Sequence, residues 1–231
     1  MTIEKLGTPH KVLLGLTTTP GSDWRGKIEE AKRFNLSEIA LFPTYLAPTD
    51  RKILYNLLKQ TPVNSIPHIH ARDDFSIEEI EYFIKNYNTK KFNFHLNEGE
   101  VVLSKFCDFT NYIYFENGSY FPDDAFQTLS GCAGLCIDFS HLYQHELADE
   151  KNYKIAEDMI DQFPVSCCHI SAVRDNLSEH TLNHENEIDY INNYLEYLPH
   201  LISIELENSF EEQLSIKKRI ESIISQKTLL A

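Results

Sequence analysis

Hydrophobic and polar positions follow two alternating patterns along the chain. Short apolar or β-branched runs have the length of buried strands, and each is followed by a longer polar or amphipathic stretch. The strands predicted from this pattern are 12–18, 38–43, 65–71, 91–96, 112–117, 134–139, 165–170 and 201–206. The predicted helices are 23–34, 50–60, 76–86, a short piece near 100–106, a piece near 123–129, 149–162, 187–197 and 210–225.

Eight strands alternating with helices predict an α/β protein, a single (β/α)8 TIM barrel over residues 1–231. A doubly wound sheet is the alternative, because periodicity does not show whether a sheet closes. Asp23, Ser76 and Asp149 are predicted helix N-caps, and Ser76 with Glu79 has the spacing of a capping box. No Pro/Gly/Ser-rich linker or low-complexity tract divides the chain, which favours one domain.

Composition and charge restrict the partners that such a fold could serve. The formal net charge is −14, which disfavours a broad nucleic-acid surface because phosphate contacts need clustered Lys and Arg. No apolar run is long enough to cross a bilayer, and the N-terminal sequence lacks a signal-peptide pattern, so a cytoplasmic protein is expected. The 5 cysteines are an odd number, and we interpret them as reduced thiols rather than a disulfide framework.

Titratable side chains end six consecutive predicted strands. Barrels of this type collect reacting groups where the strands run into the following loops, so these side chains are expected to share one mouth. A single histidine in such a position is typical of a hydrogen-bonded core residue, but six polar strand ends together indicate a site. The candidates in chain order are His68, His70, His95, Glu116, Asp138, His141, His169, Glu205 and Glu207.

The mixture of imidazoles and carboxylates at these strand ends indicates a metal site. It suits Zn²⁺, Mn²⁺, Co²⁺ or Fe²⁺ better than Mg²⁺, which prefers oxygen ligands alone. Asp138 is expected to point into the mouth as a ligand, and His141 to reach back as a ligand or as a partner of Asp138. We therefore expect one to three divalent ions, zinc or manganese before the others.

Four short motifs resemble the xylose isomerase-like TIM-barrel superfamily, which includes sugar isomerases and epimerases and type IV apurinic endonucleases. They are "PH" at 67–68, "NFH" at 93–95, "FEN" at 115–117 and "CIDFSH" at 136–141. The resemblance implies the isomerases' four metal ligands at Glu116, Asp138, His169 and Glu205. The trinuclear zinc set of the endonucleases would add His68, His95, His141 and His180.

The chain also departs from the patterns of that superfamily. Ser178 stands where the endonucleases place an aspartate ligand, and His184 and Asn186 replace two glycines, which puts a complete third zinc site in doubt. Ser171 stands where the isomerases often carry a lysine. Arg174, the nearest cation, is a candidate for binding a phosphate or sugar oxygen, with a plain surface arginine as the alternative.

Two activities are implied by the one site. We first expect a metal-dependent isomerase or epimerase acting on a small carbohydrate-like substrate, with Glu116 and Glu205 as base and acid and His141 holding a substrate oxygen. A zinc phosphodiesterase resembling the endonucleases is the alternative, and a metal-binding barrel without catalysis is a third. His70, Arg174 and Glu207 are candidate substrate-binding residues, and Glu207 could replace Glu205 as the eighth-strand ligand. The sequence leaves the oligomeric state open.

Overall fold

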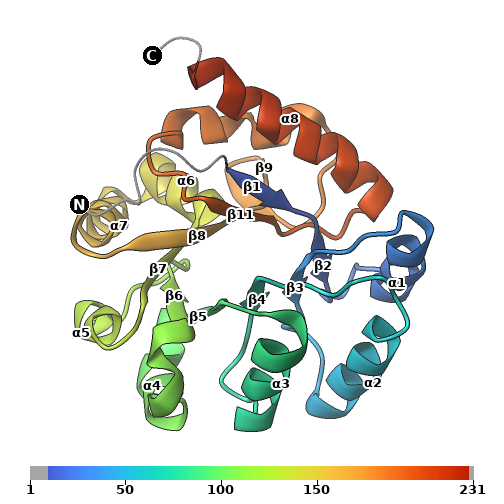
Figure 1. The fold of residues 1–231 in the computed structure, drawn as a ribbon. Helices are drawn as coiled ribbons and strands as arrows, with labels where there is room; N and C mark the ends of the chain where they lie inside the picture. The colour runs from blue at the N-terminus through green and yellow to red at the C-terminus, as the bar shows by residue number, and fades with distance from the viewer. Residues whose placement is uncertain (1–9, 229–231) are drawn as a thin grey trace.

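The chain forms a nearly closed, barrel-like parallel sheet surrounded by helices. The structure is a computed structural model that describes residues 10–228. Nine strands pair in the order β1-β11-β8-β7-β6-β5-β4-β3-β2. The two edge strands, β1 (Lys11–Leu13) and β2 (Gly15–Thr17), are separated in sequence by Leu14 alone, so the edges of the sheet lie one residue apart. Figure 1 shows the resulting ring of strands end-on, with helices outside it.

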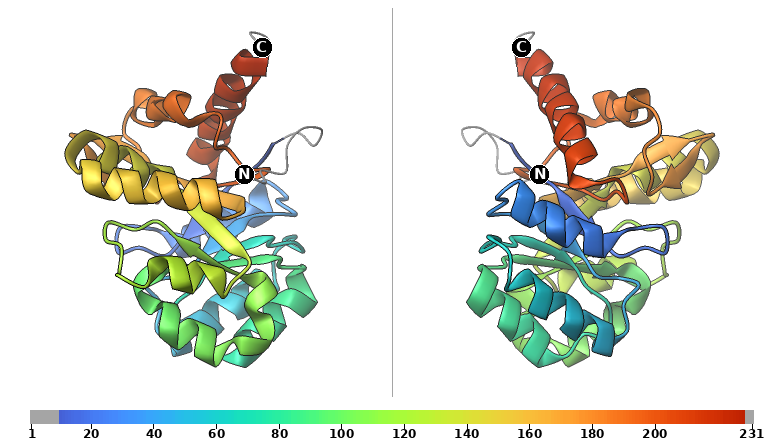
Figure 2. Two further views of the ribbon diagram at one scale, coloured as in Figure 1. Left: turned by 90° about the vertical axis from the view of Figure 1, so that its left-hand side faces the viewer. Right: turned by 90° about the vertical axis from the view of Figure 1, so that its right-hand side faces the viewer.

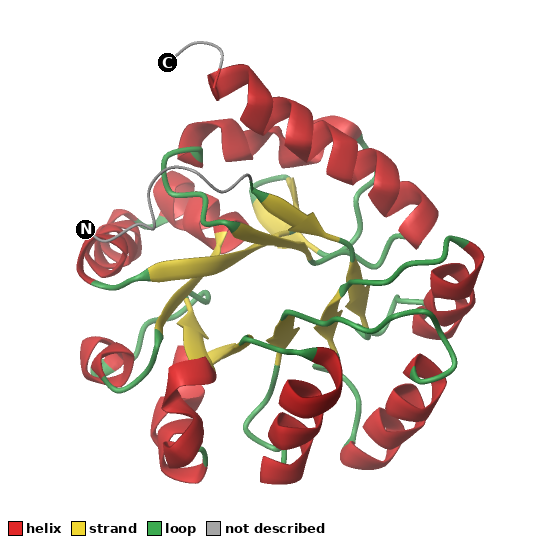
Figure 3. Cartoon of the chain, in the orientation of Figure 1, coloured by secondary structure: helices red, strands yellow, loops and turns green. Residues whose placement is uncertain are grey.

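The remaining strands and the helices alternate along the chain. The other strands of the ring are β3 (Ala40–Phe42), β4 (His68–His70), β5 (Lys91–His95), β6 (Ile113–Glu116), β7 (Gly134–Asp138), β8 (Val165–Ile170) and β11 (Leu201–Ile204). The α-helices are α1 (Trp24–Arg33), α2 (Pro48–Leu58), α3 (Ile77–Tyr87), α4 (Gly99–Lys105), α5 (Ala125–Ser130), α6 (Phe139–Ala148), α7 (Glu150–Gln162) and α8 (Phe210–Thr228). Figure 3 separates the two kinds of element by colour, and Figure 2 shows the same layering from two sides.

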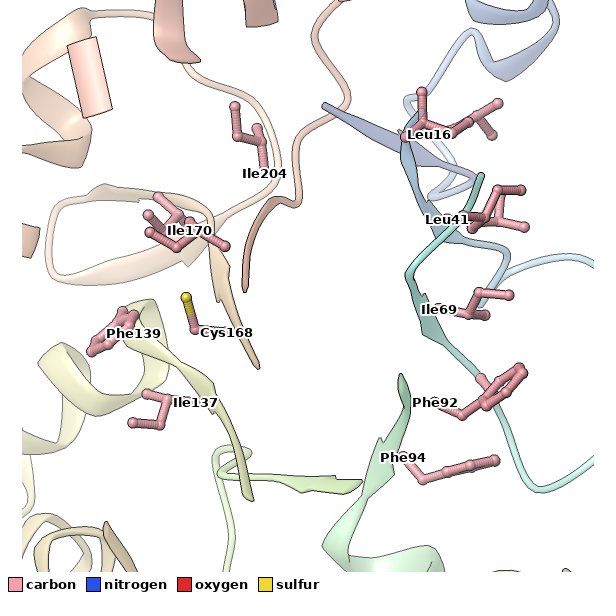
Figure 4. Close-up of a cluster of buried hydrophobic side chains, with 14 of the residues drawn as sticks. Leu16, Leu41, Ile69, Phe92, Phe94, Ile137, Phe139, Cys168, Ile170 and Ile204 are labelled. Carbon is pink, nitrogen blue, oxygen red and sulfur yellow. The ribbon is translucent and has the colours of Figure 1, made fainter. Parts of the chain in front are cut away.

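The period-2 alternation of the strands divides apolar from polar side chains. In β5, Phe92 and Phe94 are buried in the main core cluster, whereas His95 lines an inner cavity. Figure 4 shows side chains such as Leu16 and Ile137 pointing away from the centre of the ring, where the helices cover them. The main core therefore lies between sheet and helices. The inward positions hold the polar groups together with a second, smaller apolar cluster, which includes Phe42 and Cys136 beside His169.

Local sequence signals fix several helix ends as predicted. The carboxylate of Asp23 accepts from Gly26 N at the start of α1, and that of Asp149 accepts from Asn152 N at the start of α7. Ser76 and Glu79 form the complete capping box of α3.

Three local predictions were wrong or incomplete. Residues 187–197 were predicted as an α-helix, but this part of the chain forms the 3-10 helix η3 (Glu185–Tyr194). The helix α6 was not predicted; it begins because Asp138 ends β7 and caps the next turn through its side chain. The antiparallel hairpin β9 (Ala172–Arg174) and β10 (Leu177–Glu179) was also missed, although its turn carries the left-handed residues Asp175 and Asn176.

Two further short 3-10 helices, η1 (Leu96–Glu98) and η2 (Cys107–Tyr112), flank α4. Within residues 10–228, no helix is both long and apolar enough to cross a membrane. The N-terminal sequence on which the signal-peptide prediction depends begins in residues 1–9, outside the described residues.

The start of β2 is held by a buried side chain from the last helix. Gln213 Oε1 accepts from Gly15 N at 2.7 Å, and its Nε2 donates to the carbonyls of Gly15 and Leu206 at 3.0 and 3.1 Å. Lys27 on α1 is also buried there and donates to the same two carbonyls at 3.2 and 2.6 Å. The C-terminal helix thus connects edge strand β2 to the segment that follows β11, the neighbour of the other edge strand, β1.

Candidate metal centre

The carboxyl ends of the parallel strands meet around one small cavity. Its volume is about 130 Å³. Because parallel strands all end at the same edge of a sheet, polar residues that close different strands become neighbours. The cavity is lined by Thr19, Thr44, Tyr45, His70, Arg72, His95, Glu116, Asp138, His141, His180 and Glu205.

Glu116, at the end of β6, lies at the centre of the cluster and is 3% exposed. Its Oε1 is 3.1 Å from His95 Nε2 on the neighbouring strand β5. Its Oε2 faces two other imidazoles, His70 Nε2 at 3.7 Å and His169 Nδ1 at 3.4 Å. The two oxygens of one carboxylate are therefore directed at different histidines.

Glu205 approaches the same histidines from the end of β11. Its Oε2 is 3.2 Å from His169 Nδ1 and its Oε1 is 3.6 Å from His70 Nδ1. His70 and His169 themselves face each other with ring centroids 5.3 Å apart. Two buried carboxylates thus share two buried imidazoles.

Several ring nitrogens in this cluster make no hydrogen bond. They are both nitrogens of His70, Nδ1 of His169 and Nδ1 of His180. Leaving a buried polar atom unpaired costs about 1–3 kcal/mol. Two ligands of a tetrahedral zinc ion, each about 2.1 Å from the metal, are about 3.4 Å apart. The spacings around His169 Nδ1 match that separation, which fits nitrogen atoms arranged for a cation.

Asn93, in the middle of β5, fixes the orientation of the cluster. Its Nδ2 donates to Glu116 Oε2 at 2.5 Å, which directs its Oδ1 toward His68 and His169. That oxygen lies 3.0 Å from His68 Nε2 and 3.3 Å from His169 Nε2, so both nitrogens are assigned as donors. A neutral His169 then presents the lone pair of Nδ1 to the two carboxylates, which is the arrangement of a metal-ligating histidine.

The charges of the cluster balance within the protein. Burial raises the pKa of Glu116, but the His70, His95 and His169 rings outweigh it and hold this pKa below its ordinary value. Burial by itself lowers the pKa of His169, but the opposite effect of the Glu205 carboxylate is larger, and the pKa is raised to about 9. For His95, Glu116 likewise outweighs burial and raises the pKa to about 11. Carboxylates at this site are stabilised by positive charge, which a divalent cation can supply in place of protons.

Asp138 and His141 border the cavity from the β7–α6 junction. Asp138 Oδ1 accepts from Ser140 N, Ser140 Oγ and His141 N, so this oxygen caps α6. Its Oδ2 lies 3.8 Å from His141 Nε2. The structure therefore places His141 on the first turn of α6, with its Nδ1 2.9 Å from Gln144 Oε1.

His68 lies one inward position before His70 on β4 and is fully buried. Its Nδ1 bonds Ser203 Oγ at 2.7 Å and its Nε2 bonds Asn93. It does not line the cavity. Three groups of described residues could hold a metal ion: His70, His95 and Glu116; His70, His169 and Glu205; and His68, Cys136 and His169.

Two of the predicted substrate-binding residues lie outside the lining of this cavity. Arg174 Nε pairs with Glu187 Oε1 at 2.9 Å, and its Nη2 donates to Thr181 O at 2.7 Å. Glu207 accepts from Gly21 N and Thr181 Oγ1 and lines a separate cavity of about 330 Å³. His70, the third of these residues, lies between Glu116 and Glu205 and belongs to two of the possible metal groups.

Sequence reasoning missed Asn93, Arg72 and Glu98. Asn93 carries a usable signal, because it precedes His95 by two residues and so shares its inward face. Arg72 lies in the loop after β4 and Glu98 ends the short 3-10 helix after β5, where no strand periodicity predicts the direction of a side chain.

Together these features define an α/β protein with a barrel-like parallel sheet and a buried His–carboxylate centre able to hold a metal. Comparison with models of known protein families and with curated proteins finds no match to this chain.

Proposed function

We propose that the chain is a (β/α)8 barrel, in which β1 and β2 count as one strand interrupted at Leu14, and that it is a divalent-metal-dependent phosphoester hydrolase. The observation that carries the proposal is the divided carboxylate of Glu116. One oxygen faces His95 and the other faces His169, so this residue stands between two sets of ligand atoms. Carboxylates in such positions are suited to bridging two metal ions.

The two sets can be assigned to separate ions. His70, His95 and Glu116 would hold the first, and His169, Glu205 and Glu116 would hold the second. Asp138 borders the same cavity, and its Oδ2, which lies 3.8 Å from His141 Nε2, would be the oxygen offered to the second ion. Two such ions would supply a water of lowered pKa and neutralise charge on a phosphoryl group.

The remaining side chains support proton transfer and substrate placement. His141 borders both the central cavity and an adjoining cavity of about 240 Å³. Asn97, Ser119 and Tyr120 also line the adjoining cavity. Burial by itself lowers the pKa of His141, but the nearby Asp138 carboxylate contributes to a net increase. The raised pKa favours a proton on this ring. His141 is therefore placed to hold a proton for a leaving oxygen, and the adjoining cavity has room for the rest of a small substrate.

The charge of the chain favours a small substrate over a polymer. Two divalent ions would exceed the three carboxylates Glu116, Asp138 and Glu205 by one positive charge, which suits one phosphoryl group. The chain as a whole carries −14, which repels a polyanion outside the cavity.

Metal analysis and hydrolysis of bis(4-nitrophenyl) phosphate test this proposal. The zinc- or manganese-loaded protein is expected to hold two ions per chain and to release 4-nitrophenol. Glu116→Gln should lose at least one ion and reduce the rate by about 100-fold or more. Glu100→Gln, a charge-matched change at an exposed position of α4, is the control and should match the wild type. Two bound ions without hydrolysis of any phosphoester would refute the activity.

A single-metal isomerase or epimerase is the second candidate. It is favoured by the convergence of Glu116 and Glu205 on one atom, His169 Nδ1, at 3.4 and 3.2 Å. Two carboxylates facing one position could serve as base and acid for a proton next to a carbonyl. One tightly bound ion, together with exchange of deuterium from D₂O into a ketose, would support this candidate over hydrolysis.

A further inference from the structure

Glu98 is a buried carboxylate that the centre described above does not use. It is the last residue of η1, directly after β5, and its side chain is 10% exposed. Its Oε2 is buried without a hydrogen-bond partner. A carboxylate held in this way is costly unless nearby positive groups compensate for its burial.

Two such groups flank Glu98. Its Oε1 lies 3.8 Å from His95 Nδ1 and 3.6 Å from Arg72 Nε. The other nitrogen of His95 faces Glu116 at 3.1 Å, so this imidazole lies between two carboxylates. Glu98 therefore occupies the position of the outer partner that orients a metal-ligating histidine.

Arg72 extends the same carboxylate contact to the cavity. It follows β4, lines the central cavity, and its side chain is 41% exposed. Among the described residues that line this cavity, it is the single Lys or Arg. The contact with Glu98 is made through Nε, and no hydrogen bond of the two terminal guanidinium nitrogens is found within residues 10–228.

We propose that Arg72 binds an anionic phosphoryl oxygen of the substrate and that Glu98 is the positioning residue that aims both Arg72 and His95. This inference rests on the proposed hydrolase and deepens it by assigning the group that recognises the substrate's charge. A guanidinium offers paired donors that match two oxygens of a phosphoryl group. Glu98 limits its motion at the Nε side and leaves the terminal nitrogens directed to the ligand.

Binding of inorganic phosphate to the metal-loaded protein tests Arg72 directly. By isothermal titration, Arg72→Gln should weaken binding by about 10- to 100-fold, the range for hydrogen bonds to a charged group. Arg72→Lys should restore part of the affinity, because it keeps the charge and loses the fork. With the chromogenic diester, Arg72→Gln should raise KM while kcat changes little. Arg25→Gln, at an exposed arginine stacked on Trp24, is the control.

Glu98→Gln tests the positioning role with two readouts. Phosphate binding should weaken about 10-fold, and competition with a metal indicator should show one of the two ions weakened by about 10- to 100-fold. A merely structural role would lower the melting temperature and leave both affinities unchanged, and that result would overturn the assignment. Unchanged phosphate affinity in Arg72→Gln, with two ions still bound, would refute the role of Arg72 alone. A wild-type protein that binds no ions would instead refute the proposed function.

Discussion

Asn93→Ala removes a buried side chain that connects His68, Glu116 and His169, which lie on three other strands of the sheet. The substitution deletes the acceptor shared by His68 Nε2 and His169 Nε2, at 3.0 and 3.3 Å, and the donor to Glu116 Oε2 at 2.5 Å. Both histidines are fully buried, so water does not replace the lost acceptor. The two donors keep only Cys136 Sγ, a weak acceptor at 3.9 Å from His68 Nε2 and 3.4 Å from His169 Nε2, so we expect a cost of about 1–3 kcal/mol each. The free energy of unfolding should therefore fall by about 3 kcal/mol.

Thermal unfolding followed by circular dichroism measures this loss. For a chain of this size, about 3 kcal/mol corresponds to a melting temperature lower by about 6–12 °C. Metal affinity should fall by about 10- to 100-fold, because His169 loses the hydrogen bond that fixes its tautomer and ring orientation. Asn97→Ala makes the same chemical change at an exposed position and should leave both quantities unchanged. If Asn93→Ala melted and bound zinc as the wild type does, the proposed orientation of His169 would be wrong.

Three further predictions concern the protonation of His169, the buried side chains Gln213 and Lys27 beside β2, and the backbone at Gly134. With a chelator present, the free energy of unfolding should fall as pH rises from about 6.5 toward 9, because the pKa of His169 is raised to about 9 and the folded chain holds that proton more tightly than the unfolded chain. Excess zinc should reverse this pH dependence, whereas a free energy of unfolding that does not change with pH in chelator would contradict the prediction. Gln213→Met should lower the free energy of unfolding in urea by about 2 kcal/mol, since it leaves the buried N–H of Gly15 unpaired. Lys27→Met should lower it by less, because the carbonyls that Lys27 contacts keep their hydrogen bonds to Gln213, and equal losses would refute this. Gly134→Ala should cost about 2 kcal/mol or more, since φ is +144° and the new Cβ would lie 2.3 Å from a carbonyl oxygen, whereas Gly118→Ala, with nothing within 4 Å, should be neutral; a similar melting temperature for both variants would count against it.

The order of elements and much of the candidate centre could be predicted from the sequence. The run 165–170 matches β8 in full, and each of the other predicted strands overlaps a strand of the ring. Period-2 alternation explains why this worked, since it places side chains alternately on the outward face, which the helices cover, and on the inward face, which carries the polar strand ends. It also explains why Glu116, His169 and Glu205 could be selected together, because each lies at or next to the carboxyl end of a strand of the parallel sheet.

Alternation shows which face of a strand a residue lies on, but not how far along the barrel axis it lies. His68 and His70 share one face of β4, so alternation alone could not distinguish them. The resemblance assigned a metal-ligand role to His68 and left His70 as a substrate-binding candidate. Pairing with β5 sets His70 opposite Asn93 and His68 opposite Lys91. Of these two histidines, His70 is the one that lies near Glu116 and Glu205. That register depends on neighbouring strands far away in sequence, which a local pattern does not contain.

The sequence by itself determined which side chains face inward and at which strand ends acids and imidazoles occur, because both follow from a repeat of two residues. Only the tertiary structure decided which of them meet. It paired Arg174 with Glu187, away from the cavity. It also brought Asn93 into contact with Glu116, and it paired Arg72 with Glu98 from segments outside the strands. The reason is that contacts across a nearly closed sheet are fixed by strand order and register, and these are properties of the whole chain.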